Sequence, residues 1–380
     1  MTGHRHALVP PEAEELRGEV RSFLAREMRS VSPLRQADSW MGFDAEFSEK
    51  LGAAGFIGLV TPRRYGGREA SAFARYVVSE ELLAAGAPVS AHWIADRQSA
   101  PLLLKFGTEA QRERFIPTIN RGEAFFCIGM SEPNSGSDLA SIASKAVKTD
   151  RGWILNGQKI WTTNADRSHF MIALVRSEGR EDERHGGMSQ FIIDLSAPGV
   201  TIRPIRDLTG AKHFNEVFFD DVELSHDALV GEAGNGWSQV MAELAFERSG
   251  PERFLSSMAL MHSLIDRVGP EPDALQAFHV GRLTARLFAL RAMSLSVTAE
   301  LAEGGDPSVA ASCVKDIGTA LEQDIPEVAQ LITPDEPRVG SGSDYAQVLA
   351  YLTQLAPSFS LRGGTREILR GILARGLGLR

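Results

Sequence analysis

The hydrophobic spacing of this chain changes twice along its length, from helical to strand-like and back to helical. From Pro11 to about Gly122, apolar residues recur every three or four positions, as they do on one face of a helix. Between Phe125 and Leu229 the chain consists of short apolar runs separated by turn residues, and from Gly236 onward the helical spacing returns. This order of helices, strands and helices predicts an α+β fold whose strands are grouped together.

The length of the chain indicates more than one domain. Its 380 residues exceed the roughly 250–300 residues at which single hydrophobic cores stop growing. The changes of spacing place the boundaries of an N-terminal helical domain at residues 1–122, a small central β-barrel or sandwich at 123–234, and a C-terminal helical domain at 235–380.

Local signals predict individual helices and strands. A helix is expected over Ser71–Ala85 and another from Thr108, which should stop before Pro117 because proline lacks the N–H that a helix needs. Asn156-Gly157 predicts a hairpin turn, since both residues tolerate positive φ. Further strands are expected at Phe170–Val175, Phe191–Leu195, Val200–Ile205 and Glu216–Leu224, and the charged stretch Glu178–His185 is expected to be a solvated loop.

Composition excludes several classes of protein. Lys and Arg total 40 and Asp and Glu total 49, so the net charge is −9, and nucleic acid is not expected as a partner. Cys127 and Cys313 are the two cysteines; they cannot form a disulfide framework, which suits a reducing cytoplasm. The chain has no run of about 18 apolar residues, so no membrane span is expected. No metal site is expected either.

Two segments carry residues suited to a planar or anionic ligand. Met130-Ser-Glu-Pro-Asn-Ser-Gly-Ser-Asp138 leaves a strand, and its small residues can expose backbone N–H groups to an anion or a flavin edge. In Leu155–Asn164, strand alternation places Trp161 and Thr163 on one face, where an indole can cover a cofactor. Taken singly, the first segment is typical of an ordinary loop and the second of a core tryptophan beside a strand threonine.

The order of these segments resembles the acyl-CoA dehydrogenase flavoprotein family. The resemblance rests on four signatures that span nearly the whole chain: Cys127–Asp138, Asn156–Asn164, Phe214–Val222 and Gly363–Ile368. It implies an N-terminal helical domain, a central β domain and a C-terminal four-helix bundle. It also implies FAD-dependent α,β-desaturation of an acyl-CoA thioester.

The resemblance assigns roles to individual positions. Ile128, Met130 and Ser131 would contact the flavin ring, and Trp161 and Thr163 would cover its other side.

Outside the ring, Ser137 would lie near the CoA arm, with Gly136 beside it. Thr365 and Glu367 would bind the adenosine or pyrophosphate part of FAD. An alternative for Glu367 is an acid favoured by the dipole at a helix N-terminus.

The base that removes the α-proton stands at different positions in different members of the family. Many family members carry a Glu immediately before Gly-Thr of the C-terminal signature, where this chain has Gly363. A minority place it on a helix of the C-terminal domain, and Glu247-Arg248 resembles that arrangement. Glu247 is therefore expected to be the base, with Arg248 towards CoA or the active-site wall. The N–H groups of Gly363 or Gly364 would polarise the thioester carbonyl. The alternative is a surface acid.

Two departures from the family pattern concern subunit contacts. The Arg-x-x-Phe-Gly stretch is missing between Val268 and Leu283, and the aromatic segment before the last signature is shortened. The resemblance implies a homodimer or homotetramer, with a mixed oligomer as an alternative, and an electron-transfer flavoprotein as acceptor. Two other functions remain open, an oxidase of the same fold and a non-catalytic FAD-binding partner subunit.

Overall fold

The computed structural model describes residues 6–177 and 185–379, and for residues 242–247 it describes the backbone but not the side chains. The chain forms two compact units. The first contains the described residues up to Phe43, Ala70–Val89 and the chain from Ala245 onward; the second contains Asp44–Glu69 and Ser90–Leu244. The division into three domains at residues 122 and 234 stays a prediction.

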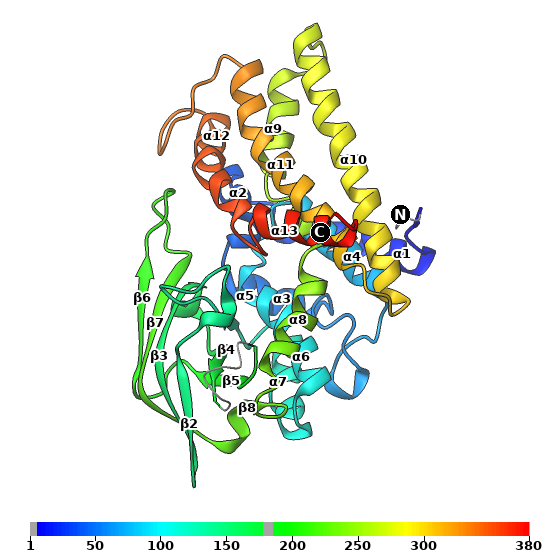
Figure 1. The fold of residues 1–380 in the computed structure, drawn as a ribbon. Coiled ribbons are helices and arrows are strands. Elements are labelled where there is room, and N and C mark those ends of the chain that lie inside the picture. Colours follow the sequence, from blue (N-terminus) through cyan, green and yellow to red (C-terminus); the bar gives the residue numbers. More distant parts are fainter. Residues whose placement is uncertain (1–5, 178–184, 380) are drawn as a thin grey trace. The chain divides into compact units, whose positions relative to one another are not determined.

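The first unit is helical. Its helices are α1 (Pro11–Glu27), α2 (Pro33–Asp38), α4 (Ala72–Ala84), α9 (Met258–Val268), α10 (Ala274–Ala302), α11 (Ser308–Ile332), α12 (Asp344–Leu355) and α13 (Arg366–Gly376). Figure 1 shows α10 and α11 as long neighbouring helices. The side chain of Asp273 caps α10 by accepting the N–H of Gln276 at 2.9 Å. The predicted helix over Ser71–Ala85 is confirmed as α4, which Ser71 caps.

Ion pairs on two buried glutamates join three helices of this unit. Glu80 of α4 accepts hydrogen bonds from Arg291 of α10 at 2.6 Å and from Arg17 of α1 at 3.0 Å. Glu81 accepts from Arg17 as well. Because a buried carboxylate without partners would be costly, these contacts fix how α1, α4 and α10 pack together.

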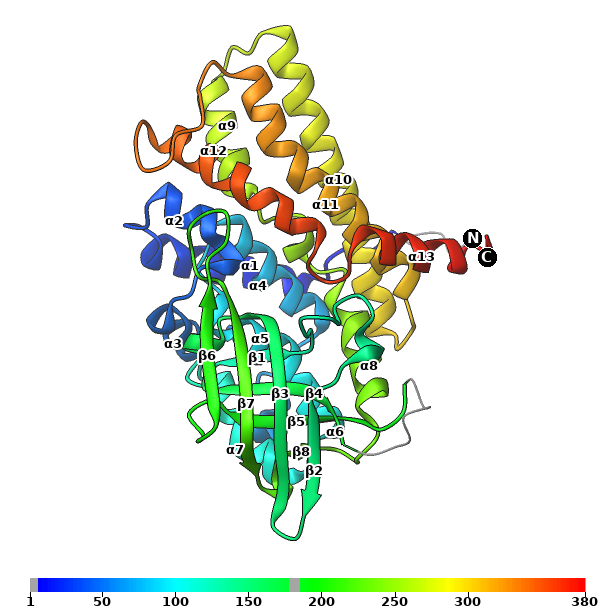
Figure 2. The ribbon, with the colours of Figure 1, turned by 60° about the vertical axis from the view of Figure 1, so that its left-hand side comes forward.

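The second unit combines helices with one sheet. Its helices are α3 (Ala45–Ala53), α5 (Ser90–Ile94), α6 (Ala100–Phe106) and α7 (Glu109–Asn120), and α8 (Gly236–Glu247) begins in it. The strands are β1 (Phe126–Gly129), β2 (Lys145–Thr149), β3 (Gly152–Thr163), β4 (Phe170–Arg176), β5 (Met188–Asp194), β6 (Val200–Ile205), β7 (Phe214–Leu224) and β8 (Leu229–Val230). They form an eight-stranded sheet in the order β6-β7-β3-β2-β4-β5-β8, with β1 parallel to β4 (Figure 2). The expected α+β fold is confirmed.

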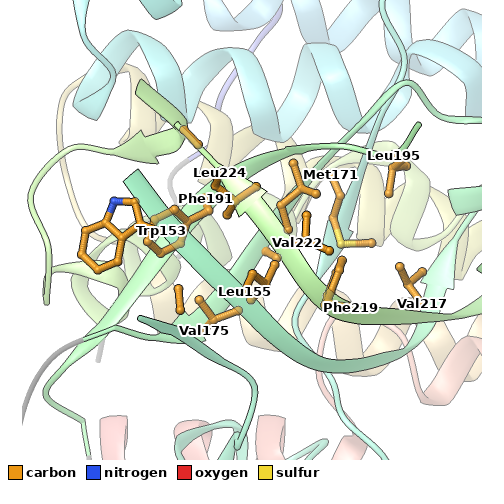
Figure 3. Close-up of a cluster of buried hydrophobic side chains, with 14 of the residues drawn as sticks. Trp153, Leu155, Met171, Val175, Phe191, Leu195, Val217, Phe219, Val222 and Leu224 are labelled. Atoms are coloured by element: carbon orange, nitrogen blue, oxygen red, sulfur yellow. The ribbon is translucent and has the colours of Figure 1, made fainter. Parts of the chain in front are cut away.

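The core of the sheet comes from inward-facing residues of β3, β4, β5 and β7. Leu155, Met171, Phe191 and Val222 are completely buried, and Figure 3 shows their side chains gathered between the strands. Trp153 packs edge-on against Phe191 with ring centroids 5.1 Å apart. Burial of these apolar faces stabilises the sheet that carries the second signature segment.

The predicted hairpin at Asn156-Gly157 is wrong, because β3 continues through both residues. The chain reverses earlier, where Thr149 of β2 pairs with Gly152 of β3. Asn156 and Gly157 instead form an irregularity against β7, where the Asn156 side chain exchanges two hydrogen bonds of 2.9 Å with Asp221. The permissive backbone of Asn-Gly is used for a bulge in place of a turn.

The predicted end of a helix before Pro117 is also wrong, since α7 runs to Asn120. Thr108 and Gln111 form a capping box at its start, as the predicted beginning required. Pro117 cannot donate to the carbonyl of Glu113, but Glu113 is exposed, and water can hydrate that oxygen. A proline near a solvated helix end therefore costs less than one in a buried interior.

Two further expectations concern the charged loop and the absence of a membrane span. Most of the expected loop at Glu178–His185 lies outside the described residues. Among the residues that are described, no helix combines the length and apolar character needed to cross a lipid bilayer.

Candidate functional site

The first signature segment forms a closed loop after β1. Glu132 and Ser135 exchange backbone hydrogen bonds of 2.8 and 3.0 Å, and the Ser135 hydroxyl donates to the carbonyl of Asp138 at 2.6 Å. Ile128, Met130 and Ser131 are half-buried, whereas Ser137 is exposed. The loop thus presents its first residues in a fixed conformation, as binding of a rigid ligand requires.

Trp161 has the most unusual conformation in the second signature segment. Its φ is 60°, in the left-handed region that costs a non-glycine residue roughly 1–2 kcal/mol. The pairing of β3 with β7 is irregular between Lys159 and Thr162, and the Trp161 side chain there is 57% exposed. Its ring lies edge-on to the ring of Phe214, with the ring centroids 6.2 Å apart. Strained backbone and an exposed indole together are features of binding sites.

The residues after Trp161 are held by hydrogen bonds from the rest of the unit. Thr163 is half-buried and pairs with Phe214 of β7. The Asn164 side chain donates to the Ser90 hydroxyl at 2.6 Å, and its backbone N–H donates to the carbonyl of His213 at 2.9 Å. Within the described residues, the buried Oδ1 of Asn164 has no hydrogen-bond partner. The exposed indole of Trp161 offers a flat aromatic face that fits a planar ring such as flavin.

The two signature segments are directly bonded to each other. The N–H of Ile160 donates to the carbonyl of Ser131 at 2.9 Å. The buried ammonium of Lys159 donates to Glu132 Oε1 at 2.7 Å and to the carbonyl of Met130 at 3.2 Å. Burial lowers the pKa of Lys159 to about 8, although Glu132 opposes this shift. The structure therefore brings together the segments that contain the five residues predicted to contact the flavin ring.

In the helical unit, Gly363 and Gly364 lie beside two arginines. Both glycines have left-handed backbones, with φ of 66° and 98°. A Cβ atom at Gly363 would lie 3.1 Å from the guanidinium carbon of Arg253, and one at Gly364 would lie 3.8 Å from Nη2 of Arg248. Arg248 and Arg253 are buried. This arrangement places positive charge where many family members are expected to carry a carboxylate.

Arg362 fixes the start of this glycine turn. Its guanidinium donates to Glu322 Oε2 at 2.8 Å and to the Ser256 hydroxyl at 2.7 Å. It also lies over the rings of Trp40 and Phe359, at 4.6 and 4.7 Å from their centroids. The backbone N–H groups that follow are consequently held in place.

Thr365 and Glu367 begin helix α13. The Thr365 hydroxyl caps the helix by accepting the N–H of Ile368 at 3.5 Å. Glu367 is exposed, and hydrogen bonds from its own backbone and from Thr365 lower its pKa. These contacts agree with the helix N-terminal alternative for Glu367, and a role of either residue in FAD binding stays a prediction.

The predicted base, Glu247, is the last residue of α8. Its side chain lies outside the part of the structure that is described. The guanidinium of its sequence neighbour Arg248 lies beside the Gly363–Gly364 turn.

The chain matches known proteins over its whole length. Residues 10–123 match the family model for the acyl-CoA dehydrogenase N-terminal domain, and residues 127–222 match that for the middle domain. Acyl-CoA dehydrogenase IpdE1 of Mycolicibacterium smegmatis is 31% identical over 97% of this chain and 98% of that protein. The chain belongs to the acyl-CoA dehydrogenase family. IpdE1 of Mycobacterium tuberculosis is 38% identical, over 62% of this chain and 63% of its own length.

Solved structures agree with this family assignment. The Tcur3481-Tcur3483 steroid ACAD has a TM-score of 0.88 and 26% identity, and the match covers 100% of both chains. The ChsE4-ChsE5 complex from Mycobacterium tuberculosis has a TM-score of 0.83 and 26% identity over 98% of each chain. This acyl-CoA dehydrogenase is therefore a flavoprotein oxidoreductase of lipid catabolism, with FAD as its cofactor.

Sequence reasoning overlooked Lys159, Glu132 and Arg253. Strand alternation from Trp153 and Leu155 places Lys159 on the buried face, and a buried lysine requires an acidic partner. That signal was available, but the hairpin wrongly expected at Asn156-Gly157 interrupts the alternation before it reaches Lys159. No local pattern links Arg253 to a glycine 110 residues away.

Proposed function

We propose that this acyl-CoA dehydrogenase desaturates an acyl-CoA thioester between its α- and β-carbons, with Glu247 as the base. The observation that carries the choice of base is the environment of Gly363. This residue has no side chain, its φ is 66°, and the Arg253 guanidinium lies 3.1 Å from the position that a Cβ atom would take. A carboxylate at this place would be paired with a cation and so would be a weak base.

In the proposed reaction the carboxylate of Glu247 takes a proton from the α-carbon. FAD, when bound, accepts the hydride that leaves the β-carbon. A carboxylate held among apolar residues is a stronger base than one in water, because burial raises its pKa. Leu244 and Phe246 precede Glu247 in the sequence, which favours such surroundings.

Negative charge develops on the thioester oxygen as the α-proton leaves. We assign its stabilisation to the backbone N–H groups of Gly363 and Gly364, held in place by the contacts of Arg362. Arg248, buried beside Gly364, adds positive charge on the same side. Ser137 lies on an exposed part of its loop, and we assign it to the CoA arm.

The cofactor is assigned to two sets of residues. Ile128, Met130 and Ser131 with Trp161 and Thr163 would hold the flavin ring. This assignment is supported by the direct bonds between their segments and by the exposed indole. For the adenosine or pyrophosphate part, we assign Thr365 and Glu367 from the family resemblance.

The base is tested with Glu247→Gln and, as a matched control, Glu243→Gln one helical turn earlier. Each purified holoprotein is titrated anaerobically with straight-chain, branched, aromatic and steroid-like acyl-CoAs while flavin absorbance is recorded. The steroid-like compound is included because the similar Tcur3481-Tcur3483 protein is named a steroid ACAD. Glu247→Gln should bind FAD but lose acyl-CoA-dependent bleaching, whereas Glu243→Gln should bleach. Normal bleaching by Glu247→Gln would show that the base lies elsewhere.

The electron acceptor is proposed to be an electron-transfer flavoprotein. An oxidase of the same fold would instead pass electrons to oxygen and form peroxide without an added acceptor. Turnover that depends on an added electron-transfer flavoprotein or dye, with no peroxide, supports the dehydrogenase. A chain that binds FAD and is not bleached by any acyl-CoA would be a non-catalytic partner subunit.

The assembly is proposed to be a homodimer or homotetramer in the cytoplasm. Apolar residues on α10 support a contact between subunits, since Leu275, Phe278 and Phe288 are 52, 62 and 72% exposed. A mixed oligomer is the alternative, because one similar structure is the ChsE4-ChsE5 complex. Light scattering of the purified chain distinguishes the homo-oligomer from the mixed oligomer. A dimer or tetramer supports the homo-oligomer, whereas a monomer supports a mixed oligomer whose second chain is absent from the sample.

A further inference from the structure

Lys159 is a buried ion that the proposed chemistry does not use. Its side chain is completely buried on β3, and its ammonium donates to Glu132 Oε1 at 2.7 Å and to the Met130 carbonyl at 3.2 Å. A buried ammonium loses the hydration that it has in water, so it is retained only where protein acceptors replace that water. Strand β3 is thereby attached to the loop that follows β1.

Both carboxylate oxygens of Glu132 also accept hydrogen bonds from backbone N–H groups. Its Oε2 accepts the N–H of Ala143 at 2.6 Å, and its Oε1 accepts the N–H of Ser144 at 3.0 Å. The Ser144 hydroxyl in turn accepts the N–H of Gln158 at 3.1 Å. The carboxylate therefore connects three segments of one compact unit: the loop after β1, the start of β2, and β3.

The ion pair lies between the two groups of residues assigned to the flavin ring. Met130 and Ser131 immediately precede Glu132, and Trp161 follows Lys159 by two positions. Between them, the N–H of Ile160 donates to the Ser131 carbonyl at 2.9 Å. The irregular pairing that exposes Trp161 begins directly after Lys159. A change in the length or direction of the Lys159–Glu132 contact would alter the distance between the two groups.

We propose that Lys159 and Glu132 are positioning residues that hold the 130–131 segment and the Trp161–Thr163 segment at the separation that flavin binding requires. This inference rests on the proposed flavin site. Neither residue needs to touch the cofactor, because the pair acts through Met130 and through the backbone of β3. A rigid site gains affinity since less ordering is left for the binding step.

The test uses Lys159→Met, Glu132→Gln and the double variant, with Lys145→Met as control. Lys145 is an exposed lysine on β2 of the same sheet, so the control repeats the substitution without removing a buried pair. For each holoprotein, FAD release is followed on dilution by the recovery of free flavin fluorescence. Visible circular dichroism of bound flavin at saturating FAD and the thermal midpoint are also recorded.

Lys159→Met should raise the FAD dissociation constant at least tenfold and change the visible circular dichroism of the flavin that stays bound. The double variant should bind FAD more tightly than Lys159→Met, because it removes the buried carboxylate left without its cation. If Lys159→Met does not fold, the FAD dissociation constant and visible circular dichroism of the double variant are compared with those of the Lys145→Met control, and both should differ from the control.

Two results would overturn the inference and are distinguishable. If Lys159→Met and the double variant have the dissociation constant and flavin spectrum of the Lys145→Met control, with only the thermal midpoint lowered, the pair is merely structural. If the unmodified protein itself binds no FAD, the proposed flavin site fails and this inference fails with it.

Discussion

Replacing Trp161 by alanine should weaken FAD binding strongly while the protein stays folded. The indole is 57% exposed, and a tryptophan side chain offers up to about 250 Å², so about 140 Å² is available for a ligand to cover. At about 25 cal/mol per Å², complete coverage is worth about 3.5 kcal/mol and half coverage about 1.8 kcal/mol. At about 1.4 kcal/mol per decade, the FAD dissociation constant should rise between about 20-fold and about 300-fold.

The effect on folding comes from the buried part of the indole, because the exposed part is already in water in the flavin-free protein. Alanine removes this buried part, about 110 Å², which is worth up to about 2.7 kcal/mol. It also removes the edge-on pair with Phe214, which is worth roughly 0.5–1.5 kcal/mol beyond area burial. At an unfolding entropy of about 2.1 cal/mol/K per residue, each kcal/mol lowers the thermal midpoint of a 380-residue chain by about 1.3 °C. The midpoint of the flavin-free protein should therefore fall by only a few degrees.

The assay compares Trp161→Ala with Trp161→Phe and with Val147→Ala. Phenylalanine keeps an aromatic face and should lose less affinity than alanine. Val147 is 50% exposed on β2, so its truncation removes surface from the same sheet outside the predicted site. FAD dissociation constants are measured from flavin fluorescence and midpoints from circular dichroism. A dissociation constant for Trp161→Ala equal to that of Val147→Ala would refute the placement of the flavin beside this indole.

Two further predictions concern the base and the response to pH. Moving the acid, in a Glu247→Gly and Gly363→Glu double variant, should not restore anaerobic flavin bleaching, because the new carboxylate would meet the Arg253 guanidinium; substantial bleaching would contradict this. Burial, assisted by Arg97, lowers the pKa of His92 to about 3, whereas the unfolded chain binds this proton near pH 6.5. The stability contributed by neutral His92 is complete above pH 6.5 and decreases as the pH falls, by about 2 kcal/mol between pH 7 and pH 5. Urea unfolding at these two pH values should show a larger loss for the unmodified protein than for His92→Gln, and equal losses would show that His92 is not buried as a neutral ring.

Periodicity predicted the strands and long helices well because it depends on burial along one element. Leu283 and Leu290 are buried on α10, and Leu321 and Ile325 on α11, in the region after Gly236 where helical spacing was expected to return. Ile317 has the same helical spacing from Leu321 but is 38% exposed. Predictions that depended on a local breaker were less secure. Pro117 was expected to end α7, but whether a missing N–H matters depends on the solvation of the carbonyl one turn earlier, which the sequence does not state.

The candidate site could be predicted where its residues lie close together in the sequence. Trp161 was assigned to the flavin from the residues around it in the sequence. The structure adds two observations that support this assignment, the positive φ of Trp161 and its exposed side chain. The pairing of Lys159 with Glu132 depends on which segments the sheet places side by side. A lysine 27 residues from its partner has no periodic relation to it, so this contact required the fold.

The glycine at 363 is more than the loss of a catalytic acid. Its φ of 66° disfavours any side chain, and the Arg253 guanidinium occupies the space that a side chain would enter. Restoring a glutamate alone would therefore introduce backbone strain and an ion pair that weakens the base. Arg253 is itself buried, so removing it would disturb the packing below the turn. A glutamate at 363 would thus be paired with Arg253 and weakened as a base, and relatives of this chain whose base is at the first position should lack Arg at the second.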